Sequence, residues 1–349
     1  MTSGTGPKGH TPVLPGSDPQ ALARAAEILC RGGLVGFPTE TVYGLGARAD
    51  DDAAVAKIFA AKGRPVDHPL IVHVSDAAQA QHFAATWPAL AARLAAAFWP
   101  GPLTLIVPRR PGLASGAAGG QDTIGLRCPG HPLAHALLVA AAARGVPGVA
   151  APSANRFGRI SPTTAAHVQS EFGDALSVLD GGACSDGIES AIVDCSRGRP
   201  VLLRPGSLSR EALAAAAGEP LAERDADAPR ASGTLEAHYA PRARLRLMPS
   251  AALADALALW ADAQAAASKS PAATVPPRLA VYSRTVRVPK AAGLVARAMP
   301  GVARAAAFEL FAVLRELDAL GVALIWVEHP PAAAEWDGVR DRLQRAAAA

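Results

Sequence analysis

"GFPTETVYGLG" (Gly36–Gly46) joins the end of an apolar run to a cluster of polar side chains. The apolar letters "LVGFP", which include the start of this segment, predict a short buried strand. Four polar residues follow the strand within five positions: Thr39, Glu40, Thr41 and Tyr43. An ordinary strand-to-helix loop needs only one capping residue, so the cluster indicates a functional loop at a strand end. Gly44 and Gly46 are expected to let the chain turn away without crowding that loop.

Helical and strand patterns alternate on both sides of this segment. Helices are expected at 18–33, at 51–63, in a long Ala-rich stretch that ends at Phe98, at 132–145, and from Ser161–Pro162 onward. A Gly-rich loop is expected at 112–120. Strands are expected at 34–38, 69–74, 103–108, 123–129, 146–155, 176–182, 190–195 and 200–206. Because several strands follow one another directly, the pattern favours an open α/β sheet of mixed direction.

The length of 349 residues allows two domains. We expect a flexible leader at 1–13, a catalytic domain at 14–209, an extended connector at 210–243 and a small α/β domain at 244–349. The connector lacks apolar periodicity. In the last domain we expect a helix from about Ser250, a low-complexity Ala/Ser/Pro loop, and then two strands that alternate with two helices, the second ending the chain.

Composition limits the class of protein. Half of the residues are hydrophobic, which is typical of a packed globular chain, and the net charge of +4 permits attraction to anions without requiring it. The four cysteines form no C-x-x-C pair, which favours a reduced, cytosolic compartment. The polar N-terminus lacks the apolar core of a signal peptide, and no apolar run is long enough to span a bilayer. We therefore expect a cytoplasmic protein with no membrane partner.

Familiar catalytic signatures are missing from the sequence. It contains no P-loop, no G-x-G-x-x-G between a strand and a helix, and no H-E-x-x-H. What remains is a series of strand ends that carry hydroxyls and cations. In "KGRPVDHPL", Lys62 and Arg64 flank Gly63. A helix C-terminus explains one cation through the helix dipole, whereas two cations in a proline-stiffened loop indicate anion binding.

Two further residues, Arg127 and Ser161, each have two competing explanations. Thr123 and Arg127 lie four apart in a predicted strand and so face the same side. A buried Arg127 needs a partner, which is either a bound carboxylate or phosphate or an internal salt bridge, and both stay open. Ser161 is either a helix N-cap or part of a phosphate site.

In their order and spacing, the motifs resemble one family. "PTETVYGLG", "KGRPxxxPLIVHV", "WPGPLTLI", "TIGLRCP", "APSANRFGRISPT", "ESAIVD" and "LLRPG" resemble the YrdC-type threonylcarbamoyl-AMP synthases over residues 14–209. The "HYAP" of the connector and the C-terminal unit resemble the longer, two-domain members. The resemblance implies an open twisted mixed sheet with a concave active site, followed by a small Rossmann-like domain. It also implies synthesis of L-threonylcarbamoyladenylate and pyrophosphate from ATP, L-threonine and bicarbonate.

The resemblance assigns roles to individual residues. The catalytic pair is Lys62 and Arg64. The residues implied to bind L-threonine are Thr41, His73, Arg127, Ala151 and Ser190, with Thr39 and Tyr43 shaping the same pocket. The residues implied to bind ATP are Arg64, His68, Thr123, Ser153, Ser161, Arg204, His238 and Tyr239. Mg²⁺ is expected with the triphosphate, although no residue is assigned to a metal.

The resemblance also implies partners and leaves alternatives. A tRNA threonylcarbamoyl transferase complex would use the product downstream, and weak direct tRNA binding stays open. The family often has Asn at the position of His68, and its usual "SPGMxxxHYAP" reads "ASGTLEAHYAP" here, which makes the lid the least secure element. One alternative is a non-catalytic RNA-binding module of the same fold, which low aromatic content disfavours. Another is carbamoyl transfer, as in larger proteins whose zinc-finger segments this chain lacks.

Overall fold

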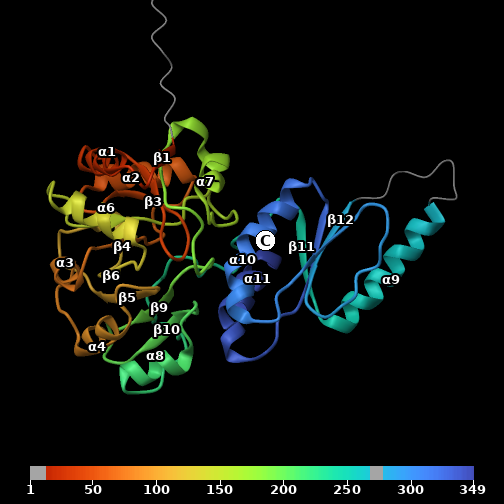
Figure 1. Cartoon of the computed structure of the whole chain (residues 1–349). Helices are drawn as coiled ribbons and strands as arrows, with labels where there is room; N and C mark the ends of the chain where they lie inside the picture. The colour runs from red at the N-terminus through yellow and green to blue at the C-terminus, as the bar shows by residue number, and fades with distance from the viewer. Residues whose placement is uncertain (1–12, 268–277) are drawn as a thin grey trace, which may run out of the picture.

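A computed structural model describes residues 13–267 and 278–349 as two α/β units joined by a connector (Figure 1). The predicted leader, apart from Val13, and most of the predicted low-complexity loop lie outside the described residues. Within the described ranges, no helix is both long and apolar enough to cross a membrane.

The first unit is built on one mixed sheet. Its strand order is β1-β8-β2-β3-β7-β4-β6-β5-β9-β10, and parallel pairs such as β4 with β6 alternate with antiparallel pairs such as β2 with β3. The strands are β1 (Val13–Pro15), β2 (Val35–Phe37), β3 (Gly44–Arg48), β4 (Ile71–His73), β5 (Leu103–Pro108), β6 (Thr123–Arg127), β7 (Val149–Ala150), β8 (Ser177–Asp180), β9 (Ala191–Asp194) and β10 (Val201–Arg204). The predicted open α/β sheet of mixed direction is confirmed.

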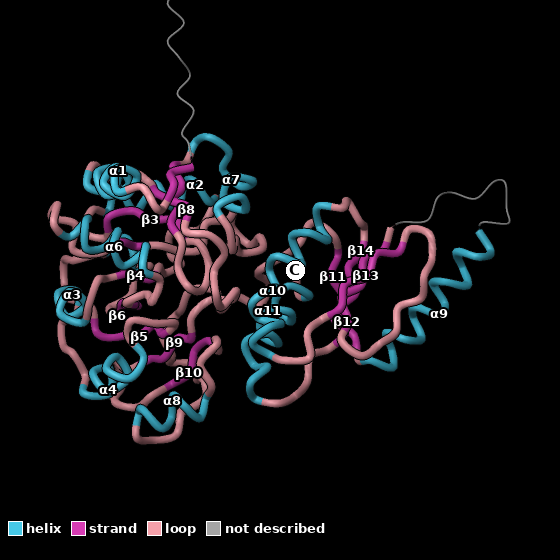
Figure 2. Tube along the Cα trace, in the orientation of Figure 1, coloured by secondary structure: helices cyan, strands magenta, loops and turns pink. Residues whose placement is uncertain are grey.

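Helices surround this sheet (Figure 2). They are α1 (Pro19–Cys30), α2 (Asp52–Lys62), α3 (Ala77–Phe83), α4 (Ala89–Phe98), α5 (Ser115–Ala118), α6 (Pro132–Ala142), α7 (Ala165–Phe172), the 3-10 turn η1 (Gly173–Ala175) and α8 (Arg210–Ala217). Local chemistry sets their ends. Asp51 accepts hydrogen bonds from two backbone N–H groups at the start of α2, and Gly63 ends α2 in the left-handed conformation at φ +66°.

Four sequence-based expectations fail locally. The long Ala-rich helix is two helices, since Pro88 lacks an N–H group and caps α4. The Gly-rich loop at 112–120 contains the short α5. The helix expected at Ser161 begins only after Thr164, whose side chain accepts from His167 N. The first eight residues of the connector form α8, because Ser209 and Gly218 cap an Ala-rich run.

Gly44 and Gly46 do not turn the chain away, which corrects a further prediction. Both lie inside β3, paired with β2. A Cβ atom at Gly46 would lie 2.8 Å from the buried side chains of Phe37 and Val149. These glycines therefore allow β3 to pack closely against the ring of Phe37.

The second unit has a four-stranded sheet in the order β11-β14-β12-β13, with all neighbours parallel. Its elements are β11 (Arg244–Met248), α9 (Ser250–Ala267), β12 (Leu279–Ser283), β13 (Leu294–Ala298), α10 (Ala303–Ala319), β14 (Leu324–Glu328), η2 (Ala334–Trp336) and α11 (Asp337–Ala347). Sequence patterns missed β11 and β13, which are only partly buried. A parallel sheet with helices is the expected Rossmann-like arrangement.

The two units share one hydrophobic cluster. Val42, from the polar segment quoted first, and Ile188 in the catalytic domain are buried together with Phe311 and Leu343 of the C-terminal domain. Helices α10 and α11 lie on the side of the C-terminal domain that faces the catalytic sheet (Figure 1). The C-terminal domain thus packs directly behind the polar segment.

Candidate active site

The polar segment Thr39–Tyr43 connects β2 to β3. Thr39 Oγ1 donates to Val42 O at 2.6 Å and accepts from the N–H groups of Thr41 and Val42, both at 3.2 Å. Thr39 therefore fixes the loop itself. Thr41 Oγ1 lies 2.8 Å from Thr39 Oγ1 and accepts from Arg127 Nη1 at 2.9 Å. The hydroxyls of Thr39 and Thr41 thus hold the loop in contact with Arg127.

Arg127 forms a buried ion pair with Glu40, 2.8 Å between Nη2 and Oε1. Burial raises the pKa of Glu40, but the charge of Arg127, together with hydrogen bonds from the Gly130 backbone and from Arg127, outweighs it and holds this pKa below its usual value. The internal salt bridge, one of the two explanations offered for Arg127, is therefore present. Arg127 also borders a cavity beside Thr41, so binding a ligand carboxylate is compatible with it.

A cavity of about 40 Å³ lies at the ends of these strands. It gathers side chains from segments that are far apart in the sequence. The predicted site residues that line it are Thr39, Thr41, Arg64, His73, Arg127, Ala151, Ser153, Ser190, Arg204, His238 and Tyr239. This convergence could not be derived from any single motif.

The other predicted residues lie just outside this cavity. Lys62 Nζ donates to the backbone oxygens of Ser153, at 2.7 Å, and Asn155, directly behind the wall. His68 lines an adjoining cavity of about 230 Å³ that also borders Arg64. Thr123 lines a small cavity next to Ile71. Tyr43 points elsewhere, because its hydroxyl donates to Gly182 O at 2.7 Å, so the expectation that it shapes the pocket is wrong.

Ser161 is not a helix N-cap, because the following helix is capped by Thr164. Ser161 is fully buried, and its hydroxyl donates to Glu189 Oε1 at 2.5 Å. Glu189 itself lines the cavity. The tertiary contact therefore prevails over the local Ser-Pro capping pattern.

Three buried cations at the site have no carboxylate partner among the described residues: Lys62, Arg64 and Arg204. Burial lowers the pKa of Lys62 well below its usual value and that of Arg64 to about 10. Burial also lowers the pKa of Arg204. Unpaired buried charge is costly, so this arrangement indicates a site for an anion with several charges.

Polar atoms without a partner support the same conclusion. Among the described residues, Arg64 Nε, His238 Nδ1 and Tyr239 Oη are buried and make no hydrogen bond. Buried polar atoms are almost always paired in folded proteins. Burial lowers the pKa of His238 to about 3 and that of His73 also to about 3, so both imidazoles are neutral near pH 7. A bound ligand can satisfy these atoms.

The connector closes over the cavity. Ser232 O accepts from Arg204 Nη1 at 2.7 Å. Gly233 has φ +72°, and a Cβ atom there would lie 2.6 Å from Tyr239 Oη. Arg230 fastens the same segment to the catalytic domain through Asp67 at 3.1 Å and through Gly119 O at 2.6 Å. The divergent "ASGT" thus occupies a lid position in spite of its departure from the family pattern.

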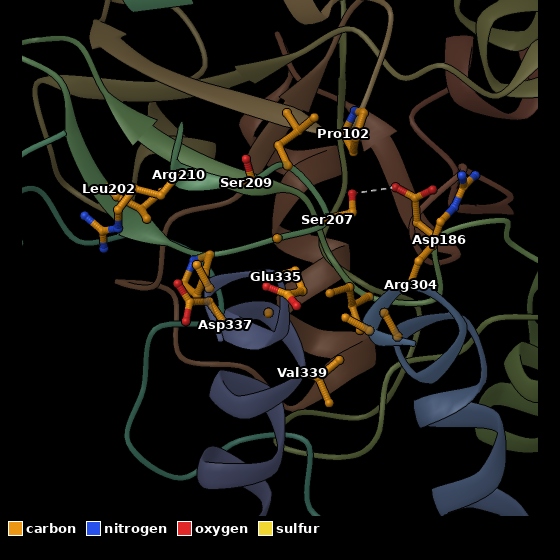
Figure 3. A pocket seen from close by; sticks show the side chains of 18 residues that line it. Pro102, Asp186, Leu202, Ser207, Ser209, Arg210, Arg304, Glu335, Asp337 and Val339 are labelled. Carbon is orange, nitrogen blue, oxygen red and sulfur yellow. Dashed lines mark hydrogen bonds between the residues drawn. The ribbon is translucent and has the colours of Figure 1, made fainter. Parts of the chain in front are cut away.

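A second, larger cavity of about 330 Å³ lies between the two domains (Figure 3). It contains none of the predicted site residues. Asp186, whose side chain accepts from Ser207 at 2.7 Å, and Arg304 face it from opposite domains. It is separated from the first cavity by the segments around Ile188 and Pro205, whose neighbours Glu189 and Arg204 line the first cavity instead.

Sequence analysis missed two residues that border the site. Glu189 stands inside the quoted "ESAIVD", yet it was not considered as a site residue. Arg342 lies on α11, more than a hundred residues away, and its Nε donates to Glu189 at 2.9 Å. Its surroundings, "RDRLQR", look like an ordinary charged helix surface, so no local signal could have identified it.

Comparisons with known proteins identify relatives of both domains. A family model described as "Telomere recombination", for Sua5, YciO and YrdC proteins, matches residues 27–206. Another, described as "Threonylcarbamoyl-AMP synthase, C-terminal domain", matches residues 208–348. A threonylcarbamoyl-AMP synthase of Bacillus subtilis is 43% identical over 68% of this chain and 69% of its own length. One from Schizosaccharomyces pombe is 35% identical over 72% of this chain and 70% of its own length.

Solved structures extend the similarity to the whole chain. The crystal structure of Pyrococcus abyssi Sua5 complexed with L-threonine has a TM-score of 0.83 at 34% identity, and it covers 95% of both chains. An alanine variant of the same protein has a TM-score of 0.84 at 32% identity and covers 97% of this chain and 96% of that one. These similarities do not favour the RNA-binding alternative. The chain therefore belongs to the Sua5 family of threonylcarbamoyl-AMP synthases, in its long, two-domain form.

Proposed function

We propose that this protein forms L-threonylcarbamoyladenylate and pyrophosphate from L-threonine, bicarbonate and ATP. The observation that carries the proposal is the group of three buried cations, Lys62, Arg64 and Arg204, without carboxylate partners in the described chain. A triphosphate supplies the matching charge. Relatives named threonylcarbamoyl-AMP synthase, and one solved with L-threonine, support the choice of nucleotide and amino acid.

We divide the cavity into two subsites. L-threonine is proposed to lie against Thr41, His73, Arg127, Ala151 and Ser190, with its carboxylate on Arg127. ATP is proposed to lie toward the connector, against Arg64, His68, Thr123, Ser153, Arg204, His238 and Tyr239, which line the three cavities there. Ser161 lines none of these cavities and is proposed to belong to the ATP subsite through its hydrogen bond to Glu189. The connector closes over this cavity through Ser232 and Gly233, so we propose that it moves to admit the ligands.

The proposed chemistry needs positioning and neutralisation of charge. The threonine nitrogen attacks bicarbonate and water leaves, which gives a carbamate. A carbamate oxygen then attacks the α-phosphorus of ATP, and the bond to pyrophosphate breaks. Lys62 and Arg64 would stabilise the negative charge that builds on the phosphates, and no covalent intermediate on the protein is required.

Magnesium is proposed to enter bound to ATP. Among the described residues, no group of three or more His, Cys, Asp or Glu side chains could hold a metal ion. The two acids that border the site, Glu40 and Glu189, are each paired with an arginine. The described residues therefore offer no cage for the metal, and the phosphates would provide its ligands.

The cellular setting is also a proposal. We place the protein in the cytoplasm, where its product would pass to a tRNA threonylcarbamoyl transferase complex, and all four cysteines are free thiols. Direct tRNA binding, where it occurs, would be weak. We also propose the domain limits 14–209 and 244–349, with 210–243 as connector and lid.

The test is the release of pyrophosphate from ATP by the purified full-length protein. Release should require both L-threonine and bicarbonate, and the product should be threonylcarbamoyladenylate by mass spectrometry. L-valine, which lacks the hydroxyl, is the matched control and should support little release. Release that is independent of threonine would refute the proposed function.

A further inference from the structure

The C-terminal domain reaches the active site through one buried side chain. Arg342 lies on α11 and is 0% exposed. Helix α11 packs so closely on the catalytic domain that a Cβ atom at Gly338 would lie 2.7 Å from Gly206 O and from the side chain of Ile188. This close approach brings Arg342 to the wall of the catalytic cavity, although it does not line the cavity itself.

Arg342 makes contacts on both strands of one hairpin. Its Nε donates to Glu189 Oε2 at 2.9 Å, and its Nη2 donates to Glu189 O at 3.0 Å. Its Nη1 donates to Pro205 O at 2.8 Å. Glu189 lies two residues before β9, and Pro205 immediately follows β10. The planar guanidinium thus joins the ends of two paired strands.

The residues next to these contacts belong to the proposed substrate subsites. Ser190 follows Glu189, and Arg204 precedes Pro205. Arg204 Nη2 donates to Ser190 O at 2.9 Å, so the two segments are also joined on the cavity side. Ser161 donates to the other oxygen of Glu189. Displacement of Arg342 would therefore shift three residues that are proposed to contact the ligands: Ser190, Arg204 and Ser161.

Arg342 also neutralises a negative charge beside the site, that of Glu189. Glu189 is a buried carboxylate on the cavity wall, and an unpaired carboxylate there would attract the cations that ATP needs. Burial raises the pKa of Glu189, but the charges of Arg342 and Arg204 outweigh it and keep it below its usual value. The pair formed with Arg342 satisfies this charge from the side away from the cavity.

We propose that Arg342 is a positioning residue for ATP: it neutralises Glu189 and leaves Arg204, which in the described chain bonds only neutral oxygens, without a carboxylate partner and available to phosphate. The inference rests on the proposed function, and it gives the C-terminal domain a role in catalysis. Helix α11 also holds the lid, because His238 N donates to Arg345 O at 3.1 Å and Arg345 donates to Leu235 O. One helix therefore supports both the wall and the cover of the nucleotide subsite.

The experiment compares three variants with the full-length protein, whose threonine-dependent pyrophosphate release is measured first. Arg342→Ala should raise KM for ATP at least about tenfold at pH 8, because truncating one partner of a buried charge pair is costly. KM for threonine should change less. Arg304→Ala removes an exposed cation from the same interface (Figure 3) and should change neither constant by more than about twofold.

Two readouts separate positioning from a merely structural role. Without Arg342, the pKa of Glu189 should rise because only Arg204 and Ser161 still oppose the effect of burial, so KM for ATP should fall as pH falls from 8 to 6. Adding Glu189→Gln should lower KM for ATP at least about fivefold relative to Arg342→Ala and remove that pH dependence. The charged and ionisable groups around Glu189 are Arg342, Asp341, Arg204, Lys62, His238 and Tyr239.

The experiment distinguishes a failure of the proposed function from a failure of the role proposed for Arg342. An inactive wild-type protein would refute the proposed function. An active wild-type protein would refute the role of Arg342 if Arg342→Ala kept its KM for ATP, or if Glu189→Gln failed to rescue it. Calorimetric titration with ATP and the Tm of each variant accompany the kinetics. The inference would also be overturned if Arg342→Ala and the double variant lost affinity for ATP to the same extent and both losses matched their falls in Tm.

Discussion

Replacing Arg127 with methionine tests the pairing at the heart of the polar segment. Methionine keeps most of the aliphatic volume but leaves Glu40 buried without its cation, and Thr41 Oγ1 loses a donor at 2.9 Å. Removal of one partner from a buried ion pair costs about 3–5 kcal/mol. For a domain of this size that cost corresponds to a fall in Tm of about 6–20 °C.

The pH dependence of this effect has a definite sign. In the wild-type protein the pKa of Glu40 lies below its unfolded value, so the pair stabilises the fold above that value and the stabilisation is lost as pH falls. In Arg127→Met, only backbone hydrogen bonds still oppose the effect of burial and the pKa of Glu40 rises, so the variant loses stability as pH increases. The difference in Tm between the two proteins should therefore be larger at pH 8 than at pH 5.

Calorimetry at the two pH values measures this difference. The double variant Glu40→Gln, Arg127→Met should recover more than half of the loss, because it removes the uncompensated charge. Arg31→Met breaks an exposed pair with Glu27 and should cost less than about 1 kcal/mol. A small loss in Arg127→Met that is the same at both pH values would refute the reasoning. In the activity assay, KM for threonine should rise about 10- to 150-fold, the equivalent of one charged hydrogen bond.

Two other substitutions test the cation group and the packing of β3. Lys62→Ala should lower kcat/KM for ATP by about 10²-fold or more in the pyrophosphate assay, whereas Lys57→Ala, on the exposed side of the same helix, should change it less than twofold; equal effects would contradict the role given to Lys62. Gly46→Ala should lower the free energy of unfolding by about 1–3 kcal/mol in urea, because its methyl group would overlap Phe37. Gly301→Ala, with open space around it, should change that energy by less than about 0.5 kcal/mol, and a similar cost at both glycines would contradict the packing argument.

Local signals predicted most helices and strands but not the tertiary partners of site residues. The sequence placed Arg127 in a strand and required a partner for it, but Glu40 lies 87 positions earlier and belongs to a loop. Ser161 shows the opposite failure: a good capping pattern was present, yet its hydroxyl binds Glu189. The Ala-rich stretch predicts one long helix because alanines surround Pro88, yet Pro88 starts a separate helix. In each case one residue had two physically reasonable roles, and tertiary contacts determined which role it took.

The distribution of buried charge explains why two acids can border a site for a polyanion. Glu40 is paired with Arg127 and Glu189 with Arg342, and within the described residues neither carboxylate forms an ion pair with Lys62, Arg64 or Arg204. The second pairing depends on a residue of the C-terminal domain. Since unpaired buried cations destabilise the empty protein, a triphosphate that neutralises them gains free energy that an already neutral site could not supply. The catalytic domain thus carries the cations that would bind the triphosphate. The C-terminal domain supplies Arg342, which pairs with Glu189 and so keeps this carboxylate from pairing with those cations.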